Sequence, residues 1–91
     1  MIRVRHYTRV SSMRKILAEG VLRAKDQNRV FVERANDRRL SPTDARSKYG
    51  LGKGKGAAYV EFDLESERLQ WRNNPQTRCI EGFVLGDVDL S

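Results

Sequence analysis

Cysteine, histidine and proline are scarce in this chain, and the first two scarcities restrict its chemistry. The 91 residues include one cysteine, Cys79, one histidine, His6, and two prolines. A lone cysteine cannot form a disulfide within the chain, and it cannot supply an all-cysteine metal site. Because the carboxylates are scattered without recognisable ligand spacing around these two residues, we expect no bound metal ion.

Long apolar runs are missing as well. No stretch approaches the roughly 18 apolar residues that a membrane-spanning helix requires. The first residues, MIRVRHYT, are charged and lack the apolar segment of a signal peptide. We therefore expect no membrane contact. With 38% hydrophobic residues and this length, we expect a single domain, residues 1–91, with one small core.

Positive charge is present and is unevenly distributed. Residues 1–55 contain 15 Lys or Arg and five Asp or Glu, for a net charge of +10, whereas residues 56–91 contain three basic and seven acidic residues, for −4. This asymmetry predicts a polyanionic partner, either a nucleic acid or a phosphate-bearing cofactor, for the first part of the chain. The alternative is a solvated basic face that only maintains solubility.

Alternating and helical patterns predict the order β-α-β-β-α-β-β-β. Strands are expected over 2–8, 21–24, 28–35 and 57–65, as a short extended piece within 68–78, and over 79–90 with a break near Gly86. One helix is expected over 11–20, capped by Ser11 or Ser12 and ended by Gly20. A second is expected within 40–50, with Pro42 in its first turn. This order predicts an α+β fold built on a small, bent antiparallel sheet with two short helices.

The sequence also allows predictions for a glycine-rich segment and for the single tryptophan. The sequence GLGKGKG at 50–56 is glycine-rich but lacks the spacing of a phosphate-binding P-loop, so we expect a flexible loop. Its Lys53 and Lys55 are expected either to be solvated or to contact phosphate. Trp71 is expected to anchor the core, although an exposed indole could stack on a base.

Several motifs occur in an order that resembles a known family. HYT ends the first strand, ILAEGVL covers the end of the first helix, VFV forms a strand, and SPTDARSKY precedes a late strand that contains a carboxylate. This order resembles the ADP-ribosyltransferase fold, in the branch whose signature is His, Tyr and an acidic residue. It is more narrowly similar to the His-Tyr-Asp toxin domains at the ends of bacterial polymorphic toxins, such as contact-dependent inhibition and Rhs-type proteins.

The resemblance implies a biological setting. A larger bacterial protein would secrete or deliver this domain, which would act in the cytoplasm of a target cell. NAD would be its substrate, and it would transfer ADP-ribose to a target such as RNA or a translation component. An acidic immunity protein would be the expected partner of its basic face, since charge complementarity accelerates association.

The resemblance also implies roles for individual residues, which would have to meet in one cleft sized for a dinucleotide. His6 would hydrogen-bond the ribose hydroxyl beside the scissile bond, and Tyr49, or alternatively Tyr59, would stack on the nicotinamide ring. The acidic group would be Glu81 or Asp87, and the sequence does not choose between them.

Other residues would hold the rest of the substrate. Arginine forks suit diphosphate, and Arg5, Arg9 and Arg29 are the candidates for that contact. Tyr7 and Thr8, which follow His6 in its motif, join it in the expected NAD-binding set. The residues expected to contact phosphate on a nucleic acid are Arg9, Arg29, Lys53 and Lys55.

Two other functions remain open from the sequence. A metal-independent ribonuclease toxin would use His6 as general acid or base and a Lys or Arg to stabilise charge on phosphate, with a Glu or Lys replacing the missing second histidine. A non-catalytic RNA-binding module would tolerate His6→Ala. Dependence on NAD distinguishes the transferase from both.

Overall fold

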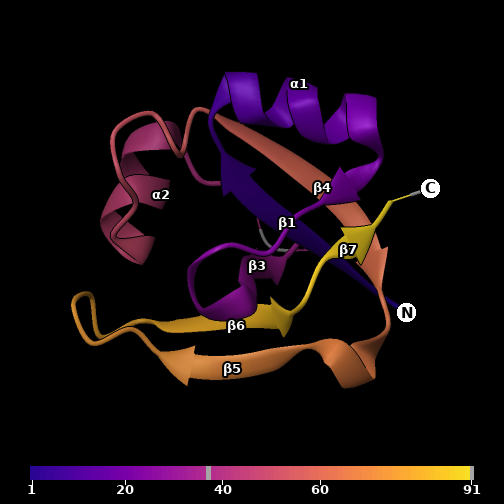
Figure 1. Cartoon of the computed structure of the whole chain (residues 1–91). Helices are drawn as coiled ribbons and strands as arrows, with labels where there is room; N and C mark the ends of the chain where they lie inside the picture. The colour runs from indigo at the N-terminus through magenta and orange to yellow at the C-terminus, as the bar shows by residue number, and fades with distance from the viewer. Residues whose placement is uncertain (37, 91) are drawn as a thin grey trace.

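Seven strands, two α-helices and two short 3-10 helices make up the computed structural model, which describes residues 1–36 and 38–90 (Figure 1). They are β1 Ile2–Thr8, α1 Val10–Glu19, β2 Val21–Leu22, η1 Asp26–Asn28, β3 Arg29–Arg34, α2 Pro42–Tyr49, β4 Ala58–Leu64, η2 Ser66–Arg68, β5 Gln70–Asn73, β6 Ile80–Leu85 and β7 Val88–Asp89. The predicted α+β class with two helices and an antiparallel sheet is confirmed.

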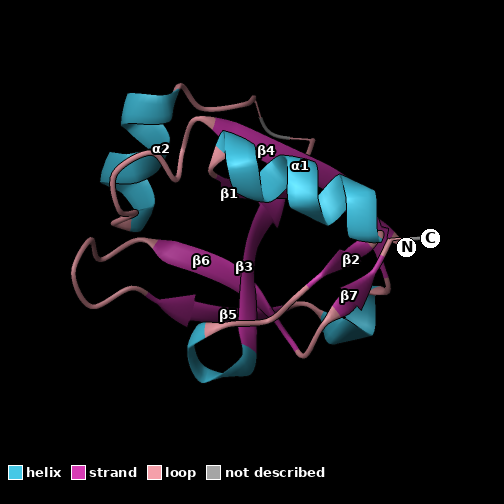
Figure 2. Ribbon diagram, turned by 45° about the horizontal axis from the view of Figure 1, so that its top comes forward, coloured by secondary structure: helices cyan, strands magenta, loops and turns pink. Residues whose placement is uncertain are grey.

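The main sheet has the strand order β4-β1-β3-β6-β5, and it opens in its middle. All seven residues of β1 pair with β4, but β1 pairs with β3 only at Val4↔Arg34 and Arg5↔Glu33. The other end of β3, from Arg29 to Val32, pairs with β6 instead. The sheet therefore consists of two parts, β4-β1 and β6-β5, that share β3 and diverge beyond Arg5 (Figures 1 and 2).

The core lies on one side of this sheet, where α1 covers β1 and β4 (Figure 2). Its buried residues are almost all aliphatic: Val4, Leu22, Val30, Val32, Val60, Phe62, Leu64, Val84 and Val88. The helix itself contains no fully buried residue and contributes the partly buried Met13 and Ile16. A second, two-stranded sheet of β2 and β7 closes one end of this core.

The predicted helix boundaries are correct in α2 and partly wrong in α1. Ser41 precedes α2 and its Oγ accepts a hydrogen bond from the Asp44 backbone N–H at 3.1 Å, with Pro42 as the first helical residue. In contrast, α1 begins at Val10 after Arg9, whose side chain makes no capping hydrogen bond, so neither serine of that segment is the cap.

The strand predicted over 21–24 and the burial predicted for Trp71 need correction. The segment 21–24 contributes only the two residues of β2. The break expected near Gly86 is confirmed, because β6 and β7 are separated at this residue, whose φ is 81°. Trp71 is 47% exposed rather than a core anchor. It lies on the edge strand β5 opposite Gly82, with the Arg34 guanidinium 5.5 Å from its ring centre.

Within residues 1–36 and 38–90, none of the helices has the length and apolarity that crossing a membrane would require.

Close packing at Gly82 gives a test of the β5-β6-β3 arrangement. A Cβ atom at this position would lie 2.9 Å from the Val32 carbonyl oxygen and 3.2 Å from Leu69. We expect Gly82→Ala to lower the free energy of unfolding by about 1–3 kcal/mol, because buried overpacking forces neighbours to move. Chemical denaturation measures this. The control is Gly52→Ala, where the nearest atom is a Lys55 side-chain carbon at 3.8 Å. Equal stability of the two variants would contradict the packing described.

Candidate functional site

A cleft of ≈ 520 Å³ opens where β1 and β3 diverge. Its wall includes the end of β1, one face of α1, residues 21–25, β3, the end of α2 and the turn between β5 and β6. The α1 residues that line it, Ser12, Lys15, Ile16 and Glu19, are spaced so that they share one helical face. Its charge is predominantly positive, since eight Lys or Arg residues line it against three Glu.

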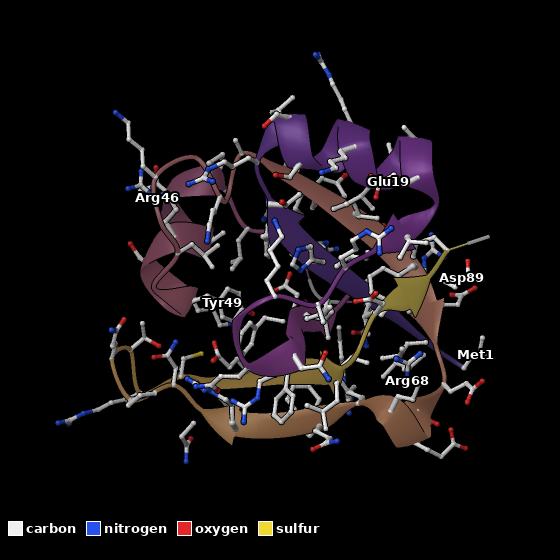
Figure 3. The ribbon with its side chains drawn as sticks, viewed as in Figure 1. Met1, Glu19, Arg46, Tyr49, Arg68 and Asp89 are labelled. Carbon is white, nitrogen blue, oxygen red and sulfur yellow. The ribbon has the colours of Figure 1, made fainter. Side chains whose placement is uncertain are left out.

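His6, Tyr49 and Glu81 all line this cleft, although 43 and 32 residues separate them along the chain. His6 comes from β1, Tyr49 is the last residue of α2, and Glu81 comes from β6. Figure 3 shows the Tyr49 side chain at the end of α2 that is nearest β6. The expected convergence of imidazole, phenol and carboxylate on a single cleft is therefore present in the structure.

The imidazole of His6 bridges the opening between β1 and β3. Its Nδ1 lies 2.7 Å from the Phe31 carbonyl oxygen. Because a carbonyl can only accept, Nδ1 carries the proton and donates, which leaves Nε2 as the acceptor of the neutral ring. Burial lowers the pKa of His6, and the charges of Lys25 and Lys55 lower it further against the opposing effect of the carbonyl.

A buried carboxylate, Glu33, organises the wall beside Tyr49. Its Oε1 accepts a hydrogen bond from the Tyr49 hydroxyl at 2.6 Å. Its Oε2 accepts from the Tyr7 hydroxyl at 2.7 Å and from Arg5 Nη1 at 2.6 Å. Arg5 also donates from Nε to Glu61 Oε2 at 2.8 Å. Two tyrosines and an arginine thus converge on one carboxylate that is 8% exposed.

The ionisation behaviour of this network follows from its contacts. Burial raises the pKa of Tyr49, and the hydrogen bond to the anionic Glu33 raises it further, so the phenol keeps its proton. Burial raises the pKa of Tyr7 in the same way. For Arg5, burial opposes the charged form, but hydrogen bonds to Glu33 and Glu61 outweigh it and raise the pKa.

Glu81 is held by two neighbours. Arg72 Nε forms an ion pair with its Oε1 at 2.9 Å, and Asn74 Nδ2 donates to its Oε2 at 3.3 Å. The same Asn74 amide donates to the Tyr49 carbonyl oxygen at 3.3 Å. Asn74 therefore ties the end of α2 to the carboxylate of β6, and Glu81 is only 5% exposed.

Asp87 lies outside the cleft, in the turn that separates β6 from β7. Its Oδ1 accepts a hydrogen bond from the Ala24 backbone N–H at 2.7 Å, and its Oδ2 is 3.7 Å from Arg23 Nη1. These contacts join the segment after β2 to the β6-β7 turn. Of the two carboxylates that the sequence left open, Glu81 lines the same cleft as His6 and Tyr49, and Asp87 does not.

Tyr59 is also separated from the cleft. It pairs with Tyr7 across β1 and β4 and does not line the cleft. The guanidinium groups of Arg5 and Arg39 lie 5.7 and 5.1 Å from the centre of its ring. Of the two tyrosines expected to stack on nicotinamide, Tyr49 lines the cleft and Tyr59 does not.

Some of the residues expected to contact phosphate line the cleft and others do not. Arg9, Arg29 and Lys55 line the cleft, whereas Lys53 does not. Arg9 Nε donates to the Lys53 carbonyl oxygen at 3.3 Å, and the Arg29 guanidinium lies over the Phe83 ring at 4.7 Å. Thr8 is buried at the end of β1 and also lines the cleft.

Arg5, which was expected to contact a diphosphate, lines the cleft, but its guanidinium is engaged with groups of the protein. It donates to Glu33, to Glu61 and, at 3.2 Å, to the Ala35 carbonyl oxygen. The side chain is 5% exposed in its ion pairs. Arg5 supports the wall of the cleft, and substrate phosphate would have to displace a buried carboxylate to reach it.

Sequence reasoning missed Glu33, Arg72 and Asn74. A charged residue inside the apolar run VFVER was a signal for Glu33, since a strand seldom carries a carboxylate there without a partner. Asn74 lies in the segment 68–78, for which the sequence predicted only a short extended piece. Its link between Tyr49 and Glu81 depends on tertiary contact, for which the local sequence offers no pattern.

Within the described part of the chain, no three His, Cys, Asp or Glu side chains are grouped in a way that could hold a metal ion.

Comparison with known proteins gives one match. The model of a family of polymorphic-toxin domains described as "HYD1 signature containing ADP-ribosyltransferase" matches residues 4–91. Searches of curated proteins and of solved structures find no significant match.

The lowered pKa of His6 predicts how stability responds to acid. Below its ordinary value of 6.5, the unfolded chain binds a proton that the folded chain resists, so the free energy of unfolding falls as pH falls through this window. This group alone contributes a slope of at most about 1.4 kcal/mol per pH unit. We expect His6→Gln, which keeps a donor for Phe31, to lose less stability than the wild type between about pH 7.5 and about pH 5. Parallel pH profiles of the two proteins in denaturation experiments would contradict the assignment.

Proposed function

Because the chain belongs to the family of ADP-ribosyltransferase toxin domains with the HYD1 signature, we propose that it transfers ADP-ribose from NAD to a macromolecule inside a competing bacterial cell. The observation that supports this proposal best is the convergence of His6, Tyr49 and Glu81 on one cleft. ADP-ribosyltransferases use NAD as substrate, and the cleft offers a volume of ≈ 520 Å³ for it. Its predominantly basic lining suits the NAD diphosphate.

In the proposed reaction, the bond between ribose C1 and the nicotinamide nitrogen breaks. Its electron pair neutralises the positive pyridinium ring, so nicotinamide leaves as a neutral molecule and positive charge develops on the ribose. Glu81 would stabilise that charge and accept a proton from the attacking group. The acceptor then forms the new bond to C1, which balances the transfer.

His6 and Tyr49 would position the substrate. The acceptor Nε2 of the neutral imidazole would take a hydrogen bond from a ribose hydroxyl, while Nδ1 stays bonded to the Phe31 carbonyl. The ring of Tyr49 would stack on the nicotinamide, since a flat face restrains a planar leaving group. Arg72 and Asn74 hold the Glu81 carboxylate before substrate arrives, which lowers the reorganisation needed during reaction.

We propose RNA as the class of acceptor, on electrostatic grounds. Arg9, Arg29 and Lys55 line the cleft, and Lys53 adjoins Arg9. A basic rim attracts a phosphate backbone. The same rim would attract an acidic inhibitor protein in the producing cell, and a larger secreted or delivered protein would carry the domain into the target cell.

A direct experiment tests this proposal. The purified protein is incubated with labelled NAD and either total bacterial RNA or bacterial ribosomes, with parallel samples that contain no NAD. We expect label to become attached to the macromolecule and nicotinamide to be released. Cleavage of RNA in the samples without NAD would instead show a ribonuclease, and binding without either product would show a non-catalytic module.

The two candidate carboxylates provide a matched pair of variants. We expect Glu81→Gln to lower the rate of transfer by about a hundredfold or more, because an electrostatic group at the reacting centre is lost. Asp87→Asn should keep the catalytic rate and lower stability by about 1 kcal/mol, since it weakens the hydrogen bond to Ala24 and the ion pair with Arg23. Rates and denaturation midpoints are measured for both. The reverse pattern of rates would make Asp87 the acidic group.

A further inference from the structure

We propose that Glu33 is a positioning residue that fixes the ring of Tyr49 in the cleft through the phenolic hydroxyl. This inference rests on the proposed function, because the expected kinetic effect concerns NAD. It adds to that function a residue outside the His, Tyr and acidic set, on a different strand from both His6 and Glu81.

The geometry of Glu33 differs from that of a group poised to react. Its two carboxylate oxygens accept from three donors at 2.6–2.7 Å, namely the hydroxyls of Tyr7 and Tyr49 and Nη1 of Arg5. The side chain is 8% exposed in its ion pair with Arg5. A carboxylate saturated by short, charge-assisted hydrogen bonds is poorly placed to accept another proton. Its contribution therefore lies in what it holds.

Tyr49 is held at both ends. Its hydroxyl donates to Glu33, and its backbone carbonyl accepts from Asn74. The ring is tilted by 34° against that of Tyr7, with the ring centres 6.2 Å apart. Tyr49 is the last residue of α2, and its hydroxyl bond anchors the far end of its side chain to β3. Loss of that bond leaves the ring held by packing against its neighbours alone, so it can populate further side-chain torsions.

Arg5 makes this arrangement possible. A buried carboxylate without a counter-charge would be costly, and Arg5 supplies that charge from the neighbouring strand. Arg5 is shared with Glu61, which contacts neither tyrosine and does not line the cleft. Glu61 is thus a natural control: it bonds the same arginine, and it has no route to the Tyr49 ring other than that arginine.

The test compares steady-state kinetics of NAD turnover in three variants. We expect Glu33→Gln and Tyr49→Phe each to raise KM for NAD about tenfold, as expected for the loss of one charge-assisted hydrogen bond, with kcat within about twofold of wild type. Glu61→Gln should leave both constants unchanged. The double variant Glu33→Gln/Tyr49→Phe should resemble either single variant, because one change weakens and the other removes the same charge-assisted hydrogen bond.

Three kinetic results would contradict a positioning role for Glu33. A merely structural role for Glu33 would reduce only the amount of active enzyme, which lowers the apparent kcat and leaves KM unchanged. That result would overturn the proposal, as would additive effects in the double variant or an equal rise of KM in Glu61→Gln. Where Glu33→Gln does not fold, Tyr49→Phe decides, because it retains the ring and the buried ion pair. An unchanged KM in Tyr49→Phe overturns the proposal.

A second measurement separates this inference from the proposed function. In a protein that does not turn over NAD at all, the transferase proposal fails, but the hydrogen bond remains observable. We expect the hydroxyl proton of Tyr49 to exchange slowly in the NMR spectra of the wild type and of Glu61→Gln, and to exchange faster in Glu33→Gln, where a neutral amide oxygen replaces the carboxylate as acceptor. A Tyr49 hydroxyl that exchanges as slowly in Glu33→Gln as in the wild type would overturn the positioning role without reference to activity.

Discussion

The buried ion pair between Arg5 and Glu33 joins the two parts of the sheet at the point where they separate. Arg5↔Glu33 is the last residue pair in the register of β1 and β3, and the same two side chains meet at 2.6 Å with 5% and 8% exposure. Removing one partner of such a pair costs about 3–5 kcal/mol, because the other charge remains buried. The pair therefore specifies the register, and the divergence that begins beyond it creates the cleft.

The second side of the sheet is stabilised by polar contacts instead of an aliphatic core. The core cluster is confined to the side covered by α1, while Arg5, Tyr7, Glu33 and Glu61 occupy the other side of β1, β3 and β4. A chain of 91 residues has little apolar surface to bury on two sides. A saturated hydrogen-bond network compensates for this, because it fixes side chains in single orientations as long as every polar atom has a partner. One consequence is that the wall of the cleft is rigid where it presents Tyr49.

The sequence predicted those features that depend on local pattern. Alternation identified β1, β3 and β4, and the Ser-Pro start with a Gly stop identified α2. The family signature pointed to His6 and Tyr49, and the structure brings both into one cleft. Alternation also placed Arg5 and Tyr7 together on one face of β1, but it could not show that this face is buried, because nothing local reveals the carboxylates of other strands that cover it.

The choice between Glu81 and Asp87 shows a second limit of the sequence. Both carboxylates lie in the same predicted segment, and only the left-handed turn at Gly86 separates the strand that faces the cleft from the one that does not. The prediction that Trp71 is buried was wrong for a related reason. Aromatic residues are usually buried, but Trp71 lies on the edge strand β5, and the residue opposite it on β6 is Gly82. The position of each residue in the three-dimensional arrangement of strands, which the sequence does not show, determines whether it lines the cleft or is exposed.

Charge links the fold to the chemistry through His6. Lys25 and Lys55 act on an imidazole whose Nδ1 is already committed to the Phe31 carbonyl, and together with burial they keep the ring neutral. A neutral ring in this orientation presents Nε2 as an acceptor within a cleft that is otherwise rich in donors. Burial is the main cause of the lowered pKa of His6, and Lys55, one of the basic residues that would attract a polyanion, lowers it further. A change that reduces the positive charge of the rim should for that reason affect both the capture of the substrate and its orientation.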